Sequence, residues 1–144
     1  MILTLHLIAT FYLVGLIWFV QIVHYPLFDG VDPTGFRDYE RRHVNRTGPV
    51  VAPVMLIELV TGLLLAFKPV AAFPAPWTWV GLGLLGILWA STFLIQVPQH
   101  SVLSQGFHVR AHSRLVWTNW FRTISWSLRG LLLGWILLRV LEPS

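Results

Sequence analysis

The sequence contains no cysteine and very little charge. Without cysteine it can form no disulfide bond, thiolate metal site or iron–sulfur cluster. Only 11% of the 144 residues are charged, against about 25% in an ordinary soluble domain. Hydrophobic residues make up 56% of the chain, and a domain of this size has too little interior to bury so many. The composition therefore excludes a soluble enzyme and predicts one domain whose surplus apolar side chains face lipid.

Acidic residues and lysine are scarce as well, so most of the charge is arginine. Ten Lys and Arg residues stand against six Asp and Glu, which gives a formal net charge of +4. A basic chain can indicate nucleic-acid binding. Here the arginines lie beside apolar runs, as in membrane proteins that use them to set their orientation and to contact anionic lipids. We therefore expect membrane lipids as partners and no nucleic acid.

Four apolar segments are long enough to cross a bilayer, which needs about 20 helical residues. Their approximate bounds are 2–23, 50–67, 79–97 and 115–138. Lipid offers the backbone no hydrogen-bond partner, so each segment must be helical. The predicted fold class is all-α: a four-transmembrane-helix bundle that forms a single integral membrane domain over residues 1–144.

A short interfacial amphipathic helix is predicted between the first two spans, at about residues 33–45. Asp32 is a typical N-cap residue, and Pro33 suits the first helical position. Three- and four-residue spacing then puts several residues on the face that would lie in the membrane interface: Phe36, Tyr39, His43 and Arg46. We expect the Gly48-Pro49 pair to end this helix and to start the second span.

The arginines are distributed unevenly between the two sides of the predicted bundle. An even number of spans puts both termini on one side, together with the short link at residues 68–76. The two longer links lie on the other side, and they contain Arg37, Arg41, Arg42, Arg46, Arg110 and Arg114. The positive-inside rule then predicts that both termini lie outside and that the His/Arg-rich loops lie in the cytoplasm.

Polar residues gather at the cytoplasmic ends of the predicted spans. Five of the six histidines lie there: His24, His43, His100, His108 and His112. The first span supplies Gln21 and His24, which are three residues apart and therefore share a helical face. The third span supplies Gln96, and His100 follows one turn later. The sequence thus predicts a polar site at one membrane face.

The fourth span carries a stripe of residues at spacings of three and four. The stripe consists of His112, Leu115, Asn119, Arg122, Trp126 and Arg129. Arg122 and Arg129 fall within the hydrocarbon region, where a charge costs about 2.5–3.5 kcal/mol, so the stripe must face the bundle interior. Glu58, near the middle of the second span, is the natural partner of one of them. We interpret this pair as structural, which leaves one arginine for a backbone carbonyl, a ligand carboxylate or a phosphate.

These residues are compatible with several kinds of site. Histidines from several helices can hold a metal ion or haem iron, or act as an acid and a base. The predicted ligands and catalytic groups are His24, His100 and His112. The predicted cofactor-binding residues are Gln21, Gln96, Asn119, Arg122 and Trp126. Alternatively, the arginines bind an anionic lipid or a hydrophobic carboxylate, and the histidines only face lipid head groups. A Glu-x-x-His pair on each of two helices, typical of di-metal bundles, is absent.

Several scattered motifs resemble those of small bacterial four-helix membrane proteins, and this resemblance implies a location in the bacterial inner membrane. They are Gln21-x-x-His-Tyr-Pro-Leu-Phe28, Pro53-x-Met-x-x-Glu58, Val97-Pro-Gln-His100 and Thr118-Asn-Trp-x-Arg-Thr123. In size and span pattern the chain also resembles the anthrone-oxygenase-like membrane proteins. That resemblance implies an oxygenase or related enzyme that needs little cofactor and acts on a hydrophobic ring substrate. The site residues it implies are His24, Glu58, His100, His112, Asn119 and Arg122.

Two other classes of function stay open. An accessory subunit of a larger, energy-transducing membrane complex would use the polar residues for packing and lipid binding. Gly130-x-x-x-Gly134 would then mark a close contact with another helix, another subunit or a second copy of the chain. A small transporter would line an ion path with Glu58 and Arg129, but the paired repeats with broken helices that are typical of transporters are not visible.

Overall fold

The fold is that of a computed structural model, which describes residues 1–68 and 75–141. Within those two ranges all the regular secondary structure is helical. The first column consists of α1 (Ile2–Phe19), the π-helical turn η1 (Val20–His24) and the 3-10 turn η2 (Pro26–Gly30). The second is α2 (Pro33–Phe67), and the third joins α3 (Ala75–Ser91), the π-helical turn η3 (Thr92–Gln96) and α4 (Val97–Leu103). The fourth is α5 (Val109–Leu141).

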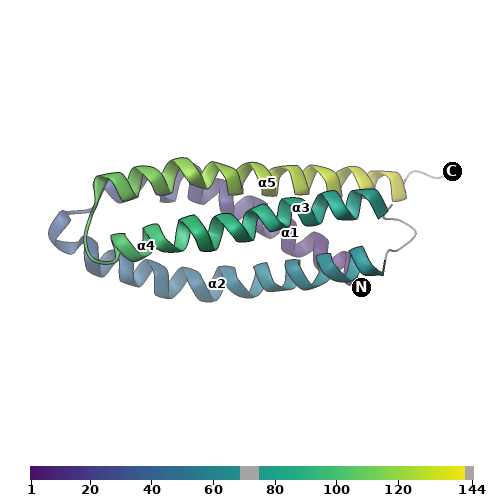
Figure 1. Cartoon of the computed structure of the whole chain (residues 1–144), viewed down its shortest axis with the longest axis horizontal. Coiled ribbons are helices and arrows are strands. Elements are labelled where there is room, and N and C mark those ends of the chain that lie inside the picture. The colour runs from purple at the N-terminus through teal and green to yellow at the C-terminus, as the bar shows by residue number, and fades with distance from the viewer. Residues whose placement is uncertain (69–74, 142–144) are drawn as a thin grey trace.

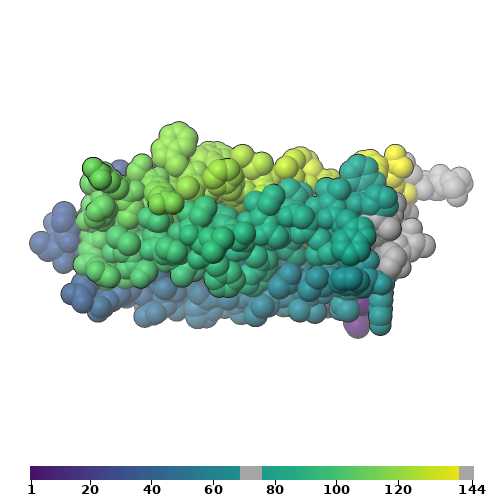
Figure 2. All heavy atoms as spheres, viewed as in Figure 1, coloured from purple at the N-terminus to yellow at the C-terminus, as the bar shows by residue number. Residues whose placement is uncertain are grey.

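These columns run alongside one another in an elongated bundle (Figure 1). α1 packs against α2 and α5, and α3 packs against α5 and α2. α1 begins and α5 ends at one end of the bundle, whereas η2 and the turn after α4 lie at the opposite end (Figure 1). Side chains fill the spaces between the ribbons and give a rod-shaped body (Figure 2). The predicted all-α class is therefore confirmed for the described part of the chain.

Three of the columns are long and apolar enough to cross a membrane. They are Ile2–Gly30, Pro33–Phe67 and Pro76–Leu103. In the most apolar window of each, no more than 33% of the residues are buried inside the bundle. Most of these apolar side chains therefore point outward, as they would in a protein surrounded by lipid.

The predicted break at Gly48-Pro49 is wrong, because α2 is one helix of 35 residues with Pro49 and Pro53 inside it. Asp32 does cap its start: the Asp32 carboxylate accepts a hydrogen bond from the Thr34 amide at 2.8 Å. Each proline removes one hydrogen-bond donor, but both lie on the exposed side of the helix. Gly48 has no β-carbon to clash with the Pro49 ring. The predicted interfacial helix is thus the first part of the long α2 helix.

Two π-helical turns interrupt the first and third columns near the same end of the bundle. In η1 the Tyr25 amide donates to the Val20 carbonyl, five residues back, at 3.0 Å. Such a turn inserts one extra residue and rotates everything that follows, and it often occurs at functional sites. Gln21 lies in η1 and Gln96 in η3, and both side chains are buried. The π-helical turns therefore direct polar side chains inward.

A buried ion pair joins all four columns farther along the bundle. Arg129 Nε donates to Glu58 Oε1 at 3.0 Å, and both side chains are almost completely buried. Glu58 also accepts hydrogen bonds from the Thr10 hydroxyl at 2.8 Å and from the Trp126 indole at 3.0 Å. Arg129 donates in addition to the Gly81 carbonyl on α3. One carboxylate and one guanidinium thereby contact α1, α2, α3 and α5.

The two glycines of the predicted GxxxG contact differ in their surroundings. A β-carbon on Gly130 would lie 3.2 Å from Val14 Cγ2 and 3.7 Å from Phe11 Cε1, both on α1. A β-carbon on Gly134 would meet no atom within 4 Å. Gly130 is thus part of a close helix–helix contact within this chain, and only Gly134 has open space beside it.

This difference predicts the outcome of a matched pair of substitutions. Gly130→Leu is expected to lower the free energy of unfolding by about 1–3 kcal/mol, because the side chain overpacks the contact with α1. Gly134→Leu should change it by less than about 0.5 kcal/mol. Unfolding of the detergent-solubilised variants by SDS, followed by circular dichroism, measures both. Equal effects would contradict the close approach of α1 and α5 at Gly130.

Candidate functional site

Glu40, His43 and His100 form a compact group of potential metal ligands. Each offers one ligand atom, and these atoms lie within 4.8 Å of one another. Glu40 and His43 are three residues apart on α2 and so share a face, while α4 contributes His100. Glu40 Oε1 lies 2.6 Å from His100 Nδ1. The second oxygen, Glu40 Oε2, is buried and has no hydrogen-bond partner among the described residues. A buried acceptor of this kind needs a partner, and a metal cation would supply one.

Neighbouring side chains lie within hydrogen-bond distance of one ring nitrogen of each histidine in the group. The Tyr25 hydroxyl lies 2.9 Å from His100 Nε2. His24 Nε2 lies 2.9 Å from His43 Nδ1, and the Thr47 hydroxyl lies 3.1 Å from the same atom. Metal-binding histidines commonly have their other ring nitrogen held in this way, which orients the ring. The arrangement leaves His100 Nδ1 and His43 Nε2 as the nitrogen atoms for a metal ion.

The other two predicted ligands have different places. His24 borders the group and contacts it through His43. His112 lies outside the group, because its Nε2 lies 2.8 Å from the Tyr25 carbonyl oxygen and its ring stacks on Phe28 with centroids 6.2 Å apart. His112 therefore holds the turn that carries Tyr25. Of the predicted set His24, His100 and His112, the structure puts only His100 in the compact group.

The three predicted cofactor-binding amides, Gln21, Gln96 and Asn119, connect helices. Gln21 Oε1 accepts hydrogen bonds from Asn119 Nδ2 at 3.0 Å and from the Thr123 hydroxyl at 3.3 Å. Gln21 Nε2 donates to the Val116 carbonyl at 3.2 Å. Gln96 Nε2 donates to the Thr118 hydroxyl at 3.1 Å. Gln21 and Asn119 thus use their polar atoms to lock η1 against α5, which positions the residues that follow η1.

Arg122 is a buried cation without an acidic partner. Its side chain is 7% exposed, and it takes part in neither of the ion pairs found in the described part of the chain. Its Nη1 donates to Asn119 Oδ1 at 3.2 Å, its guanidinium lies 5.1 Å from the Trp126 ring centroid, and the Tyr25 hydroxyl is next to it. Arg122 Nε has no hydrogen-bond partner among the described residues. Glu58 pairs with Arg129, so Arg122 is the arginine left for another acceptor.

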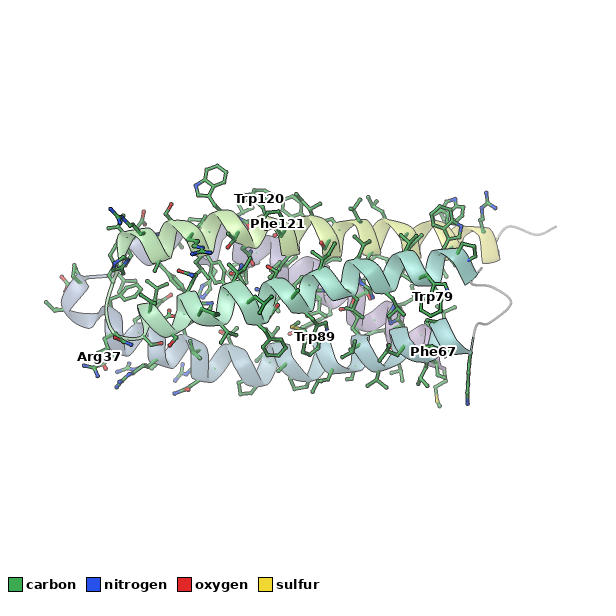
Figure 3. The ribbon with its side chains drawn as sticks, in the orientation of Figure 1. Arg37, Phe67, Trp79, Trp89, Trp120 and Phe121 are labelled. Carbon is green, nitrogen blue, oxygen red and sulfur yellow. The ribbon has the colours of Figure 1, made fainter. Side chains whose placement is uncertain are left out.

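An apolar cavity of about 440 Å³ leads to these groups. The polar residues in its lining include Tyr25, His43, His100 and Arg122. Exposed residues form its mouth. Val44, Gly48 and Ala52 of α2 lie on one side, and Phe93 of η3 and Val97 of α4 lie on the other. Trp89 and Trp126 also line the cavity, and Trp89 lies between α3 and α2 (Figure 3). The volume is that of a small-molecule pocket, and its mouth opens between two candidate spans.

The sequence interpretation missed Glu40. This residue stands in the charged run Tyr-Glu-Arg-Arg-His, which is typical of a solvated surface, yet its side chain is completely buried. Two signals indicate its position. Glu40-x-x-His43 is one copy of the motif that di-metal bundles use on two helices, and the buried Phe36 lies one turn before Glu40 on the same face.

Comparison of the chain with protein-family models, with curated proteins and with solved structures gives no match. The resemblance to the anthrone-oxygenase-like membrane proteins stays a prediction. The function proposed below is supported by the residues and distances described above.

Proposed function

We propose that this protein is a membrane-embedded, metal-dependent enzyme of the oxygenase-like type that acts on a hydrophobic ligand. The observation that carries the proposal is the group formed by Glu40, His43 and His100, two members of which, His43 and His100, line an apolar cavity. Two histidines and one carboxylate are the donor set of non-haem Fe(II) oxygenases, and this set leaves coordination positions open for substrate. When bound there, the metal supplies redox or Lewis-acid chemistry. The protein holds the ion and keeps the ligand beside it.

A single metal ion suits this site better than haem. A haem with two histidine ligands needs a flat slot between the two imidazole rings. The ring centroid of His24 lies only 4.7 Å from that of His43 and 5.2 Å from that of Phe28. Because these rings are in packing contact, they leave no room for a porphyrin beside His24. His112 is unsuited as well, since its Nε2 is used by the Tyr25 carbonyl.

We further propose that α5 is the fourth membrane span. It is 33 residues long, or about 50 Å at 1.5 Å per residue, and its two central arginines are buried. Between residues 115 and 138 its exposed side chains are all apolar: Trp117, Phe121, Ile124, Leu128, Leu131, Trp135, Leu137 and Leu138. The outward surface of α5 is therefore apolar and suits contact with lipid, although the helix as a whole contains charged residues.

The arginines support the orientation with cytoplasmic loops. All six arginines of the two longer links are exposed, and they lie at the end of the bundle that carries the candidate metal group. Arg37 lies at that end of α2, and Phe67 and Trp79 lie at the other (Figure 3). By the positive-inside rule this end faces the cytoplasm of a bacterial cell, and both termini lie outside its inner membrane. Most of the short link on the outer side, residues 69–74, lies outside the described residues.

Metal content tests the proposed function directly. The protein, purified in a mild detergent, is expected to contain about one equivalent of iron, manganese or zinc per chain, and to show no haem absorbance. After treatment with a chelator it should bind Co²⁺ with one-to-one stoichiometry, seen as visible absorbance. His108→Ala is a matched control, because His108 is exposed at the same end but outside the group. A protein that carries no metal and gives no Co²⁺ absorbance contradicts the proposal. Co-purification of that protein with other membrane subunits would favour the accessory-subunit hypothesis.

A further inference from the structure

We propose that the cavity binds a hydrophobic carboxylic acid, with its carboxylate on Arg122 and its apolar body directed toward the mouth between α2 and α4. This inference names a ligand class for the site of the proposed function. It rests on that function only for the claim that the ligand is a substrate. The binding itself follows from the charge, the unpaired polar atoms and the shape of the cavity.

The charge of Arg122 is the first observation. An arginine at this depth in a membrane protein costs about 2.5–3.5 kcal/mol and is normally paired. Arg129, two turns farther along α5, has Glu58 as its partner. The contacts recorded for Arg122 are all with neutral groups: the Asn119 carbonyl, the Trp126 ring and the Tyr25 hydroxyl. Arg122 therefore has no anionic contact among the described residues.

Unpaired polar atoms in the cavity wall are the second observation. Arg122 Nε, Trp89 Nε1 and Gln96 Oε1 are buried and have no hydrogen-bond partner among the described residues. All three side chains belong to residues that line the cavity. Two of the three atoms are donors, and a carboxylate supplies acceptors of the kind that a guanidinium binds best. We assign the carboxylate to Arg122 because it alone among these residues is charged.

The number of cations in the cavity limits the charge of the ligand. Among the described residues, Arg122 is the only Lys or Arg that lines the cavity, so one arginine faces the ligand. Arg41, Arg42 and Arg46 are exposed on the outside of α2 and do not line the cavity. A phosphate monoester, which carries about two negative charges, would need a second cation beside Arg122, whereas a single carboxylate matches the single guanidinium. The cavity therefore favours a monoanion.

The apolar walls and the position of the mouth define the rest of the ligand. Val44 and Gly48 on one side and Phe93 and Val97 on the other are exposed at the mouth, between two helices that qualify as membrane spans. A ligand dissolved in the bilayer can enter sideways, head group first. The Tyr25 hydroxyl lies both beside Arg122 and 2.9 Å from His100 Nε2. A carboxylate on Arg122 would therefore lie next to the proposed metal site.

The test compares cis-parinaric acid, a fluorescent fatty acid, with its methyl ester. Both are titrated into the detergent-solubilised full-length protein, and binding is followed by energy transfer from tryptophan, since Trp89 and Trp126 line the cavity. We expect the acid to bind at least about 10-fold more tightly than the ester, because only the acid forms a charge-assisted pair with Arg122. Acid and ester of equal affinity would overturn the inference, and this comparison needs no variant.

Variants locate the carboxylate. Arg122→Gln should remove the difference between acid and ester, and Arg122→Lys should restore part of it. Arg139→Gln is the matched control, because Arg139 is an exposed arginine on the same helix that also stacks on a tryptophan, 4.4 Å from the Trp135 centroid. Arg122→Gln that binds the acid as tightly as the wild type would overturn the assignment. Displacement of the probe by phosphatidylglycerol vesicles but not by fatty acid would overturn it in favour of a phospholipid.

Two further variants separate this inference from the proposed function. Gly48→Leu should weaken binding of both acid and ester, because a β-carbon there meets no atom within 4 Å and the side chain would extend across the mouth. In metal-free Glu40→Gln the preference for the acid should persist. If the acid binds but no metal does, the proposed function fails and this inference stands. If Glu40→Gln abolishes the preference while Arg122→Gln keeps it, the carboxylate lies on the metal and the inference fails.

Discussion

Glu58→Met is expected to lower the free energy of unfolding by about 3–5 kcal/mol, the range observed when one partner of a buried ion pair is removed. Glu58 is completely buried and accepts three hydrogen bonds, from Thr10, Trp126 and Arg129. Without it, Arg129 keeps only the Gly81 carbonyl and a contact of 3.2 Å with His6 Nε2. A cation would then be buried among four helices without an anion.

The double variant is expected to lose less stability than the sum of the losses in the two single variants. Glu58→Met combined with Arg129→Met should recover part of the lost stability, because apolar residues of similar volume often replace a buried ion pair at little cost. Thr10 and Trp126 would still lose an acceptor, at about 1–3 kcal/mol for each unsatisfied buried donor, so recovery should be incomplete. The double-mutant cycle isolates the energy of the pair.

Unfolding by SDS, followed by circular dichroism, measures these effects. Asp38→Asn is the control, since Asp38 is an exposed acid on the same helix and should change the stability by less than about 0.5 kcal/mol. If Glu58→Met is as stable as Asp38→Asn, Arg129 must reach water. Glu58 and Arg129 would then line a wet path, and the transporter hypothesis would gain support.

Some features of the fold could be predicted from the sequence because lipid restricts the choices. A charged side chain within the hydrocarbon has only one inexpensive direction, toward the bundle interior. The spacing of Arg122 and Arg129 on one stripe was therefore enough to predict that the stripe faces inward, and both side chains are buried. The apolar runs were likewise sufficient to predict an all-helical chain, because no other structure satisfies the backbone of such a segment.

Other features depend on how the helices are rotated, which the sequence does not show. Glu58 pairs with Arg129 and not with Arg122 because α2 and α5 meet in one particular register. The π-helical turns at η1 and η3 leave no clear pattern in the sequence, yet they set the direction of His24 and His100. Glu40 lies in a charged run that is typical of a solvated surface, so the sequence alone does not indicate that it is buried. With α2 continuous through both prolines, Glu40 is held in register against α4.

Metal binding by single variants is expected to distinguish the ligand set seen in the structure from the one predicted from the sequence. Glu40→Gln and His43→Ala should each weaken Co²⁺ binding by more than about 100-fold, since the loss of a mere outer-shell partner costs about 10–100-fold. His112→Ala should bind Co²⁺ nearly as the wild type does, because its ring nitrogen is used by the Tyr25 carbonyl. His100→Ala removes a ligand common to both sets and serves as the positive control.

His24→Ala is expected to weaken Co²⁺ binding to an extent between those of His43→Ala and His112→Ala. His24 contacts the group only through His43 Nδ1, at 2.9 Å, so its loss should weaken binding by about 10–100-fold, as for an outer-shell partner. Competition with a chelator of known affinity measures all the variants on one scale, and their unfolding in SDS verifies that each is folded. If His112→Ala fails to bind Co²⁺ while His43→Ala binds it as the wild type does, the ligands are His24, His100 and His112. The first column would then have to be rotated about η1 relative to the structure, because His112 cannot bind a metal while it holds Tyr25.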